Sequence, residues 1–142
     1  SLPSTLDKLS PGHKIILVHN VLTSEDDLGY IKDRMDKLYW CFCPNANLYI
    51  NGKLPDINLI QEYSENIVLG TDSLASNYQL NILDEINVLQ KHFPGLEFPV
   101  LLKWATINGA KALGIENIFG SFEKGKRPRV VNINNGAIKK LA

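Results

Sequence analysis

The chain lacks the sequence features that mark several large protein classes. Its 142 residues hold two cysteines, too few for a disulfide framework. No apolar run approaches the roughly 20 residues of a membrane-spanning helix, and there is no secretory signal and no Asn-x-Ser/Thr sequon. We therefore expect a protein of the cytoplasm that has no membrane partner.

An excess of charge of one sign is also missing. The 15 Lys and Arg residues balance the 15 Asp and Glu residues, so the formal net charge is zero. This balance excludes a strongly basic footprint, and we expect no nucleic-acid partner. Hydrophobic residues make up 44% and aromatic residues 8%, which is the composition of an ordinary globular protein with a core.

Common catalytic motifs do not occur either. The sequence contains no His-x-His, His-Glu-x-x-His, Gly-x-Gly-x-x-Gly, Gly-x-x-x-x-Gly-Lys-Ser/Thr or Gly-x-Ser-x-Gly. By itself the chain therefore lacks the three or four ligands that a catalytic metal takes. Cys41 and Cys43 lie in one apolar run, where we expect the thiols to face opposite sides of a strand and to pack as small hydrophobic groups.

Hydrophobic patterning predicts three strand–helix units in succession. Apolar runs at residues 14–18, 39–43 and 66–70 predict strands, and the first run predicts a strand buried on both faces. Periodic apolar residues after each strand predict three helices: from an N-cap at Ser24 through Met35 to Leu38, over residues 55–63 and over residues 82–93. Such a succession predicts a parallel sheet with right-handed crossovers.

The pattern changes after the third unit. A fourth helix is predicted from Pro99 to Gly114, which ends it. From Gly120 a turn and one strand at residues 130–133 follow, and the sequence shows no partner for that strand.

Polar residues follow the predicted strands. His19 comes after the first, the turn at residues 44–47 after the second, and Asp72 after the third. The carboxyl ends of parallel strands converge, and imidazole and carboxylate both ligate zinc or iron and move protons. The residues alone also allow a plainer interpretation, in which Asp72 caps a turn and His19 is a satisfied polar group at a strand end.

The segment at residues 69–77, LGTDSLASN, resembles the last barrel strand of the amidohydrolase superfamily. The similar branch contains cytosine, guanine and S-adenosylhomocysteine deaminases and chlorohydrolases. Further motifs occur in the family's order at residues 17–19, 42–47, 105–114 and 120–126. The resemblance therefore extends over nearly the whole chain.

This resemblance implies an α/β fold, the C-terminal part of a (β/α)8 barrel with about three parallel βα units, a terminal helix and a β tail. Residues 1–119 would form the partial barrel, and residues 120–142 would belong to the family's small β-sandwich. A whole barrel takes roughly 200–250 residues, so we expect a fragment, and a first residue Ser1 in place of Met agrees with that expectation.

The resemblance also implies a chemistry. Asp72 would ligate one divalent metal, zinc or iron, and take a proton from its water, while His19 would orient that water or polarise the substrate. The metal-activated water would deaminate, or dechlorinate, a small nitrogen heterocycle. Ser73 and Asn77 would orient the aspartate or cap its loop. Asn47 would support the site residues or contact the substrate, although Ala46 stands where the family usually has Ser.

Two hypotheses about the isolated chain follow. The family's His-x-His, and its further His with a nearby Glu, have no counterpart here, so we expect a hydrolase by family with little or no activity in this chain alone. The alternative is a non-catalytic α/β module that forms a homo-oligomer or binds a partner through exposed sheet edges.

Overall fold

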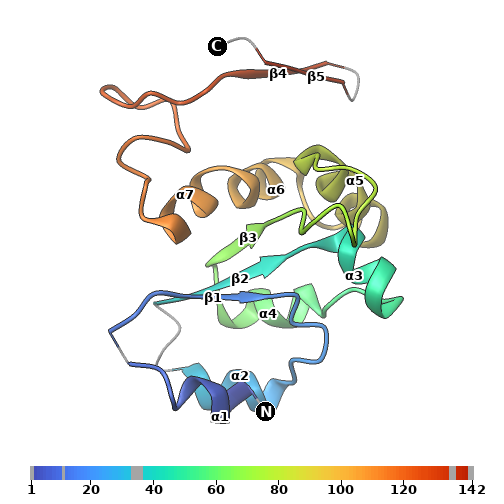
Figure 1. Cartoon of the computed structure of the whole chain (residues 1–142), viewed down its shortest axis with the longest axis vertical. Helices are drawn as coiled ribbons and strands as arrows, with labels where there is room; N and C mark the ends of the chain where they lie inside the picture. The colour runs from blue at the N-terminus through green and yellow to red at the C-terminus, as the bar shows by residue number, and fades with distance from the viewer. Residues whose placement is uncertain (1, 11, 33–36, 135–136, 141–142) are drawn as a thin grey trace.

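The computed structural model describes residues 2–10, 12–32, 37–134 and 137–140 (Figure 1). Its elements, in chain order, are α1 (Leu2–Leu6), β1 (Ile15–Val18), α2 (Glu25–Ile31), β2 (Leu38–Phe42), α3 (Pro44–Asn51), α4 (Ile57–Tyr63), β3 (Ile67–Leu69), α5 (Ile82–His92), α6 (Phe98–Ala105), α7 (Ile107–Leu113), β4 (Val131–Asn134) and β5 (Ala137–Lys140). None of the helices in these ranges is long and apolar enough to cross a membrane.

Three strands form a parallel sheet in the order β1-β2-β3. One row of the sheet aligns Leu17 of β1, Trp40 of β2 and Ile67 of β3. All three strands point the same way in Figure 1, so their carboxyl ends open on one edge of the sheet. The predicted parallel βα units are therefore confirmed.

The larger hydrophobic core lies on one face of this sheet, and a smaller cluster of Tyr39, Val68 and Ala112 of α7 lies on the other. Trp40 and Phe42 of the central strand are fully buried in the larger core, together with apolar side chains from five helices. The helical members are Leu6, Leu28, Ile31, Ile57, Ile60, Leu83, Ile86, Leu89, Leu101 and Trp104. Burial of this apolar area is the main force that holds the helices to the strands.

The first strand differs from its prediction. Ile15 and Leu17 pack against the core, but Ile16 is 37% and Val18 50% exposed, so β1 is buried on one face only. The prediction of burial on both faces is wrong because only the face that carries Ile15 and Leu17 packs against the core.

Several helix boundaries follow from local chemistry. Ser24 caps α2 as predicted, in a capping box with Asp27, but α2 ends at Ile31. Of the apolar positions predicted for this helix, Met35 lies outside the described residues and Leu38 belongs to β2. α4 begins after Asp56, whose carboxylate accepts the Leu59 amide proton.

Other helices depart further from the pattern. The single helix predicted over 99–114 is two, α6 and α7, divided at Thr106, whose hydroxyl donates to the Leu102 carbonyl. The patterning did not predict α1, and it predicted only a turn where α3 begins. Pro44 stands at the first position of α3, where its missing N–H does no harm.

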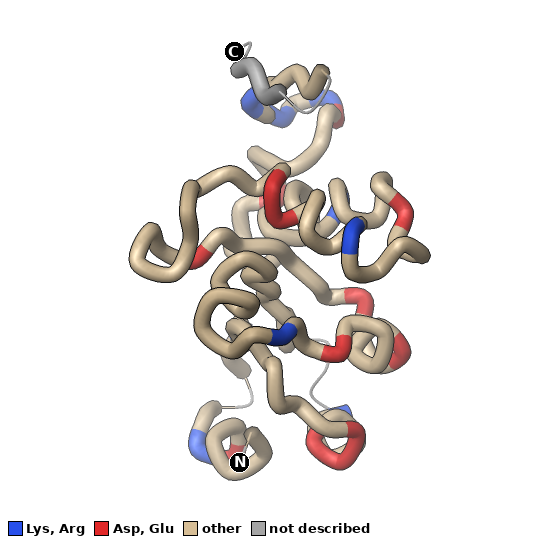
Figure 2. The backbone as a smooth tube through the Cα atoms, turned by 90° about the vertical axis from the view of Figure 1, so that its right-hand side faces the viewer, with Lys and Arg blue, Asp and Glu red and all other residues tan. Residues whose placement is uncertain are grey.

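The C-terminal strand has a partner after all. β4 pairs antiparallel with β5, and Val131 stands opposite Lys140. The prediction of an unpaired strand is therefore wrong, because the chain turns back on itself. The hairpin lies beyond α6 and α7 in Figure 1, and Figure 2 shows basic residues gathered beside it, whereas the rest of the molecule carries both signs.

A pair of leucine substitutions tests this assignment of the core. Leu101→Ala removes a fully buried side chain of α6, and we expect it to lower the free energy of unfolding by about 2–5 kcal/mol. Leu113→Ala truncates a side chain that is 66% exposed, and we expect a change within about 0.5 kcal/mol. Urea denaturation measures both, and equal losses would contradict the assignment.

Candidate functional site

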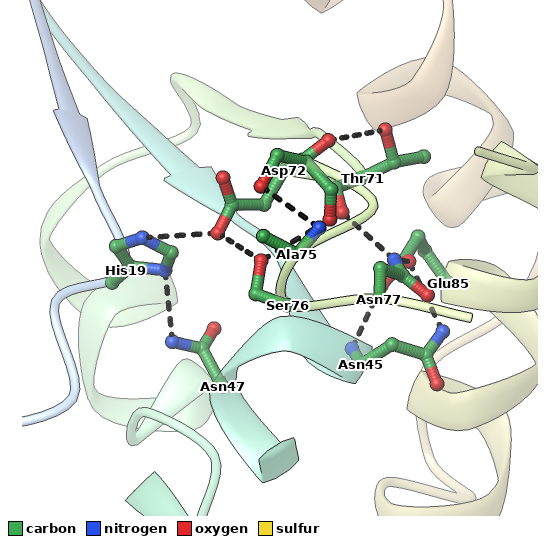
Figure 3. Close-up of polar contacts among 10 residues, drawn as sticks. His19, Asn45, Asn47, Thr71, Asp72, Ala75, Ser76, Asn77 and Glu85 are labelled. Atoms are coloured by element: carbon green, nitrogen blue, oxygen red, sulfur yellow. Dashed lines mark hydrogen bonds and ion pairs between the residues drawn. The ribbon is translucent and has the colours of Figure 1, made fainter. Parts of the chain in front are cut away.

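His19 and Asp72 meet at the carboxyl edge of the sheet (Figure 3). His19 directly follows β1 and Asp72 lies in the loop after β3, so the contact passes over the end of the central strand. His19 Nε2 lies 3.7 Å from Asp72 Oδ2, and about a third of each side chain is exposed. The separation is longer than a hydrogen bond and makes this an electrostatic contact between two accessible groups.

Both residues have an uncommon backbone conformation. His19, Asn20 and Asp72 have φ of 72°, 57° and 58°, and they are the non-glycine residues with positive φ in the described ranges. The left-handed region is unfavourable for such residues and persists where surrounding contacts enforce it. Here the His19 amide donates to the Cys41 carbonyl over 3.0 Å, and the Asn20 side chain donates to the Leu17 carbonyl over 2.8 Å.

The Asp72 carboxylate is held in its charged form. Ser76 Oγ donates to Asp72 Oδ2 over 2.7 Å, and this hydrogen bond is the largest cause of a lowered Asp72 pKa. The Ser73 backbone N–H and the nearby His19 also lower this pKa, whereas burial opposes them. Asp72 therefore remains ionised near neutral pH, as a metal ligand or proton acceptor must.

Ser73, which the resemblance placed beside the aspartate, contributes through its backbone. Its hydroxyl oxygen accepts the Ala75 amide proton over 3.3 Å and so caps the loop. Ser76, which the sequence did not single out, supplies the side-chain contact to Asp72 instead.

Asn47 contacts the other partner of the pair. It is fully buried on α3, and its Nδ2 lies 3.1 Å from His19 Nδ1. As the amide is placed, Nδ2 donates to Nδ1, and a neutral imidazole then carries its proton on Nε2, the atom that faces Asp72. Asn47 Oδ1 is buried without a hydrogen-bond partner.

A buried acidic residue, missed from the sequence, completes the polar groups at this edge. Glu85 of α5 is fully buried, and its carboxylate accepts hydrogen bonds from Asn45 and Asn77. The sequence did contain a sign of this burial, because Glu85 occupies the same helical face as the apolar Ile82, Ile86 and Leu89. A charged residue on the apolar face of an amphipathic helix indicates a buried polar contact.

The two thiols are arranged differently from the prediction. A Cβ atom built on Gly70 would lie 3.1 Å from Cys41 Sγ and 3.3 Å from Cys43 Sγ, so both sulfurs are on one side of the sheet. The prediction that the two thiols face opposite sides of a strand is therefore wrong, because residues two apart on a strand share a face. The hydrogen bond between the thiols, and then burial, raise the pKa of Cys43 well above its ordinary range.

The described residues do not by themselves make a metal site. Within the described ranges, no three His, Cys, Asp or Glu side chains cluster closely enough to bind a metal. Asp72 and His19 therefore form a pair that needs further ligands to make a catalytic metal centre.

Comparison with known proteins assigns the chain to a family. The model of the amidohydrolase family matches residues 3–140. The chain belongs to the amidohydrolase family. It is 32% identical over 125 residues to a 5-methylthioadenosine/S-adenosylhomocysteine deaminase of Saccharophagus degradans, and 30% identical over 132 residues to guanine deaminase of Mus musculus. These matches cover 83% and 86% of this chain but 28% of each relative.

Solved structures of amidohydrolases confirm the predicted fold. An adenosine deaminase from Xanthomonas campestris with bound zinc matches with a TM-score of 0.76 and 29% identity, over 90% of this chain and 30% of that one. The aminofutalosine deaminase of Helicobacter pylori matches with a TM-score of 0.68 and 32% identity. That match covers 79% of this chain and 28% of the deaminase. The α/β fold is thus part of the family's (β/α)8 barrel.

Substitution of Ser76 tests the cause of the lowered Asp72 pKa. We expect Ser76→Ala to raise this pKa toward the ordinary value of 3.8, whereas Ser73→Ala leaves it unchanged because Ser73 contributes only its backbone N–H. An NMR titration of the Asp72 carboxyl carbon in the metal-free chain measures both variants.

The sign of the stability effect follows from the same shift. Because the folded-state pKa of Asp72 is below its unfolded value, ionised Asp72 stabilises the fold above the unfolded value of 3.8, and this contribution is lost as pH falls through the folded pKa. Ser76→Ala should shrink the loss on acidification. An unchanged Asp72 titration in Ser76→Ala would contradict the assignment.

Proposed function

We propose that this chain is part of a metal-dependent hydrolase that deaminates a small nitrogen heterocycle. The contact of the ionised Asp72 with His19 at the carboxyl edge of the sheet carries this proposal. The relatives that match the chain are named as deaminases of methylthioadenosine and S-adenosylhomocysteine, of guanine and of adenosine. We therefore infer a purine or a related heterocycle as the substrate.

Asp72 suits a divalent metal as one of its ligands. Its side chain is 30% exposed, and hydrogen bonds keep it ionised, which a ligating carboxylate requires. The further ligands would come from outside the described residues, and the zinc in the matching adenosine deaminase structure supports a zinc or iron ion. When bound, such a metal lowers the pKa of water and so supplies a nucleophile at neutral pH.

The residues of this chain then handle protons and orientation. Water adds to the ring carbon that bears the amino group, and the Asp72 carboxylate would take one proton of that water and pass it to the amino nitrogen. The C–N bond then breaks, the nitrogen leaves as ammonia, and the other proton of the water ends on the ring nitrogen beside the new carbonyl. His19, with its proton on Nε2, would donate a hydrogen bond toward the water or the substrate beside Asp72. Asn47 would hold the His19 ring in that tautomer, a role that the 3.1 Å contact favours over substrate binding.

The rest of the chain has supporting roles in this proposal. Ser73 and Asn77 cap the loop that carries Asp72, while Ser76 orients the carboxylate itself. Residues 1–119 would be the partial barrel, and residues 120–142 would belong to the family's small β-sandwich. We propose that the isolated chain has little activity, because its described residues supply too few metal ligands.

A second candidate function has one observation in its favour. The free edge of β1 and the exposed Ile16 and Val18 would allow a homo-oligomer or a complex through the sheet. A monodisperse monomer in light scattering would exclude the homo-oligomer for this chain.

The deaminase proposal is tested in the longest reading frame that contains this chain. We expect that protein to hold a stoichiometric metal and to release ammonia from adenosine, guanine or methylthioadenosine. Asp72→Asn should lose most of the metal and lower the rate at least roughly 100-fold, because an amide is a weaker ligand and no proton acceptor.

Asp56→Asn is the matched control. Asp56 caps α4 away from the site, and asparagine caps equally well, so metal content and rate should remain those of the wild type. Full metal and full activity in Asp72→Asn would refute the proposed role of Asp72.

A further inference from the structure

We propose that Glu85 is a positioning residue, which fixes the Asp72 loop relative to the His19 side of the site. The geometry stands on its own, and the consequence for catalysis rests on the proposed function. Glu85 lies in the first turn of α5 and touches neither Asp72 nor His19 through any hydrogen bond or ion pair in the described structure.

The Glu85 carboxylate is buried and saturated with donors. Its Oε2 accepts the Asn45 backbone N–H over 2.9 Å, and its Oε1 accepts Asn45 Nδ2 over 3.0 Å and Asn77 Nδ2 over 2.7 Å. A fully buried carboxylate is unfavourable unless such hydrogen bonds replace water. The same low-dielectric surroundings strengthen each bond, which makes the group a rigid junction.

One arm of this junction reaches Asp72. Asn77 Nδ2 carries two protons, one for Glu85 and one for the Thr71 carbonyl, which it meets at 2.7 Å. That carbonyl belongs to the peptide that leads into Asp72, the residue with φ of 58°. Ser76, next to Asn77 in the chain, donates to the Asp72 carboxylate. Fixing Asn77 therefore constrains Asp72 from both ends of its loop, as Figure 3 shows.

The other arm reaches His19. Asn45 lies in the first turn of α3, and its backbone and side chain both donate to Glu85. Asn47, two residues further along α3, contacts His19 Nδ1. One carboxylate thus joins the helix that orients His19 to the loop that carries Asp72, so it sets the distance between the two groups.

A merely structural role for Glu85 predicts a different result. If the carboxylate only caps the start of α3, its removal would destabilise the whole chain without a particular effect on the Asp72 loop. A control in the same helix separates the two roles. Ile86 is buried beside Glu85 and belongs to the hydrophobic core, so Ile86→Ala lowers stability through lost packing.

The first readout uses the metal-free chain. Glu85→Gln keeps the size of the side chain but places an amide –NH2 against at least one donor, so at least one bond is lost. Any bond that remains to Asn77 is weaker because the acceptor is no longer charged. We compare Glu85→Gln with Ile86→Ala under conditions in which the two variants are equally stable. The amides at residues 71–77 should then exchange at least roughly tenfold faster in Glu85→Gln than in Ile86→Ala. If Glu85→Gln does not fold, Asn45→Ala removes one bond to Glu85 without touching the loop, and we expect it to accelerate the same amides in the same direction.

The second readout uses the longest reading frame that contains the chain. Zinc titration of Glu85→Gln should give an affinity roughly 10–100-fold weaker than wild type, and kcat should fall with KM little changed. Exchange and zinc affinity that match those of Ile86→Ala would overturn the inference. A wild-type protein without metal or activity would refute the proposed function, while a selectively loosened loop in the metal-free Glu85→Gln chain would still support the junction.

Discussion

The parallel alignment of three strands is the constraint on which the site depends. β1, β2 and β3 run in one direction, so the residues that follow them emerge at a single edge. His19 and Asp72 are 53 positions apart by their residue numbers, yet the sheet brings Nε2 and Oδ2 to 3.7 Å. An antiparallel β3 would have sent Asp72 to the opposite edge. The contact between His19 and Asp72 thus depends first on the direction of the strands and only then on the two side chains.

Around this edge the chain places polar groups in buried positions. Glu85 and Asn47 are fully buried, and Asn77 and Ser76 are nearly so. Such groups weaken a fold unless they are paired, and a hydrophobic substitute would serve stability as well. Their hydrogen bonds hold His19 and Asp72 in position, and they maintain the unfavourable positive φ of both residues.

The sequence predicted the three strands and the motif that identifies the family, but it missed α1 and the division of the last helix at Thr106. Apolar runs predicted the three strands because their side chains face a core, and the residues after the strands pointed to His19 and Asp72. It failed where the determining contact is distant in sequence. The start of α3 looks like a turn, and only the bonds from Asn45 to Glu85 show how its first turn is held. Two further misses are local. Ser76 lies four residues after Asp72 and β5 starts three residues after β4 ends, but neither contact leaves a hydrophobic pattern in the sequence.

Asp72 and His19 are proposed to act at one metal ion, with Asp72 as a ligand and His19 beside it. The most direct test is a crystal structure, grown with zinc, of the protein encoded by the longest reading frame that contains this chain. Anomalous scattering should place zinc about 2.0–2.2 Å from an Asp72 carboxylate oxygen, with His19 Nε2 still facing that carboxylate. Zinc bound elsewhere, or an Asp72 side chain turned away from His19, would contradict the account.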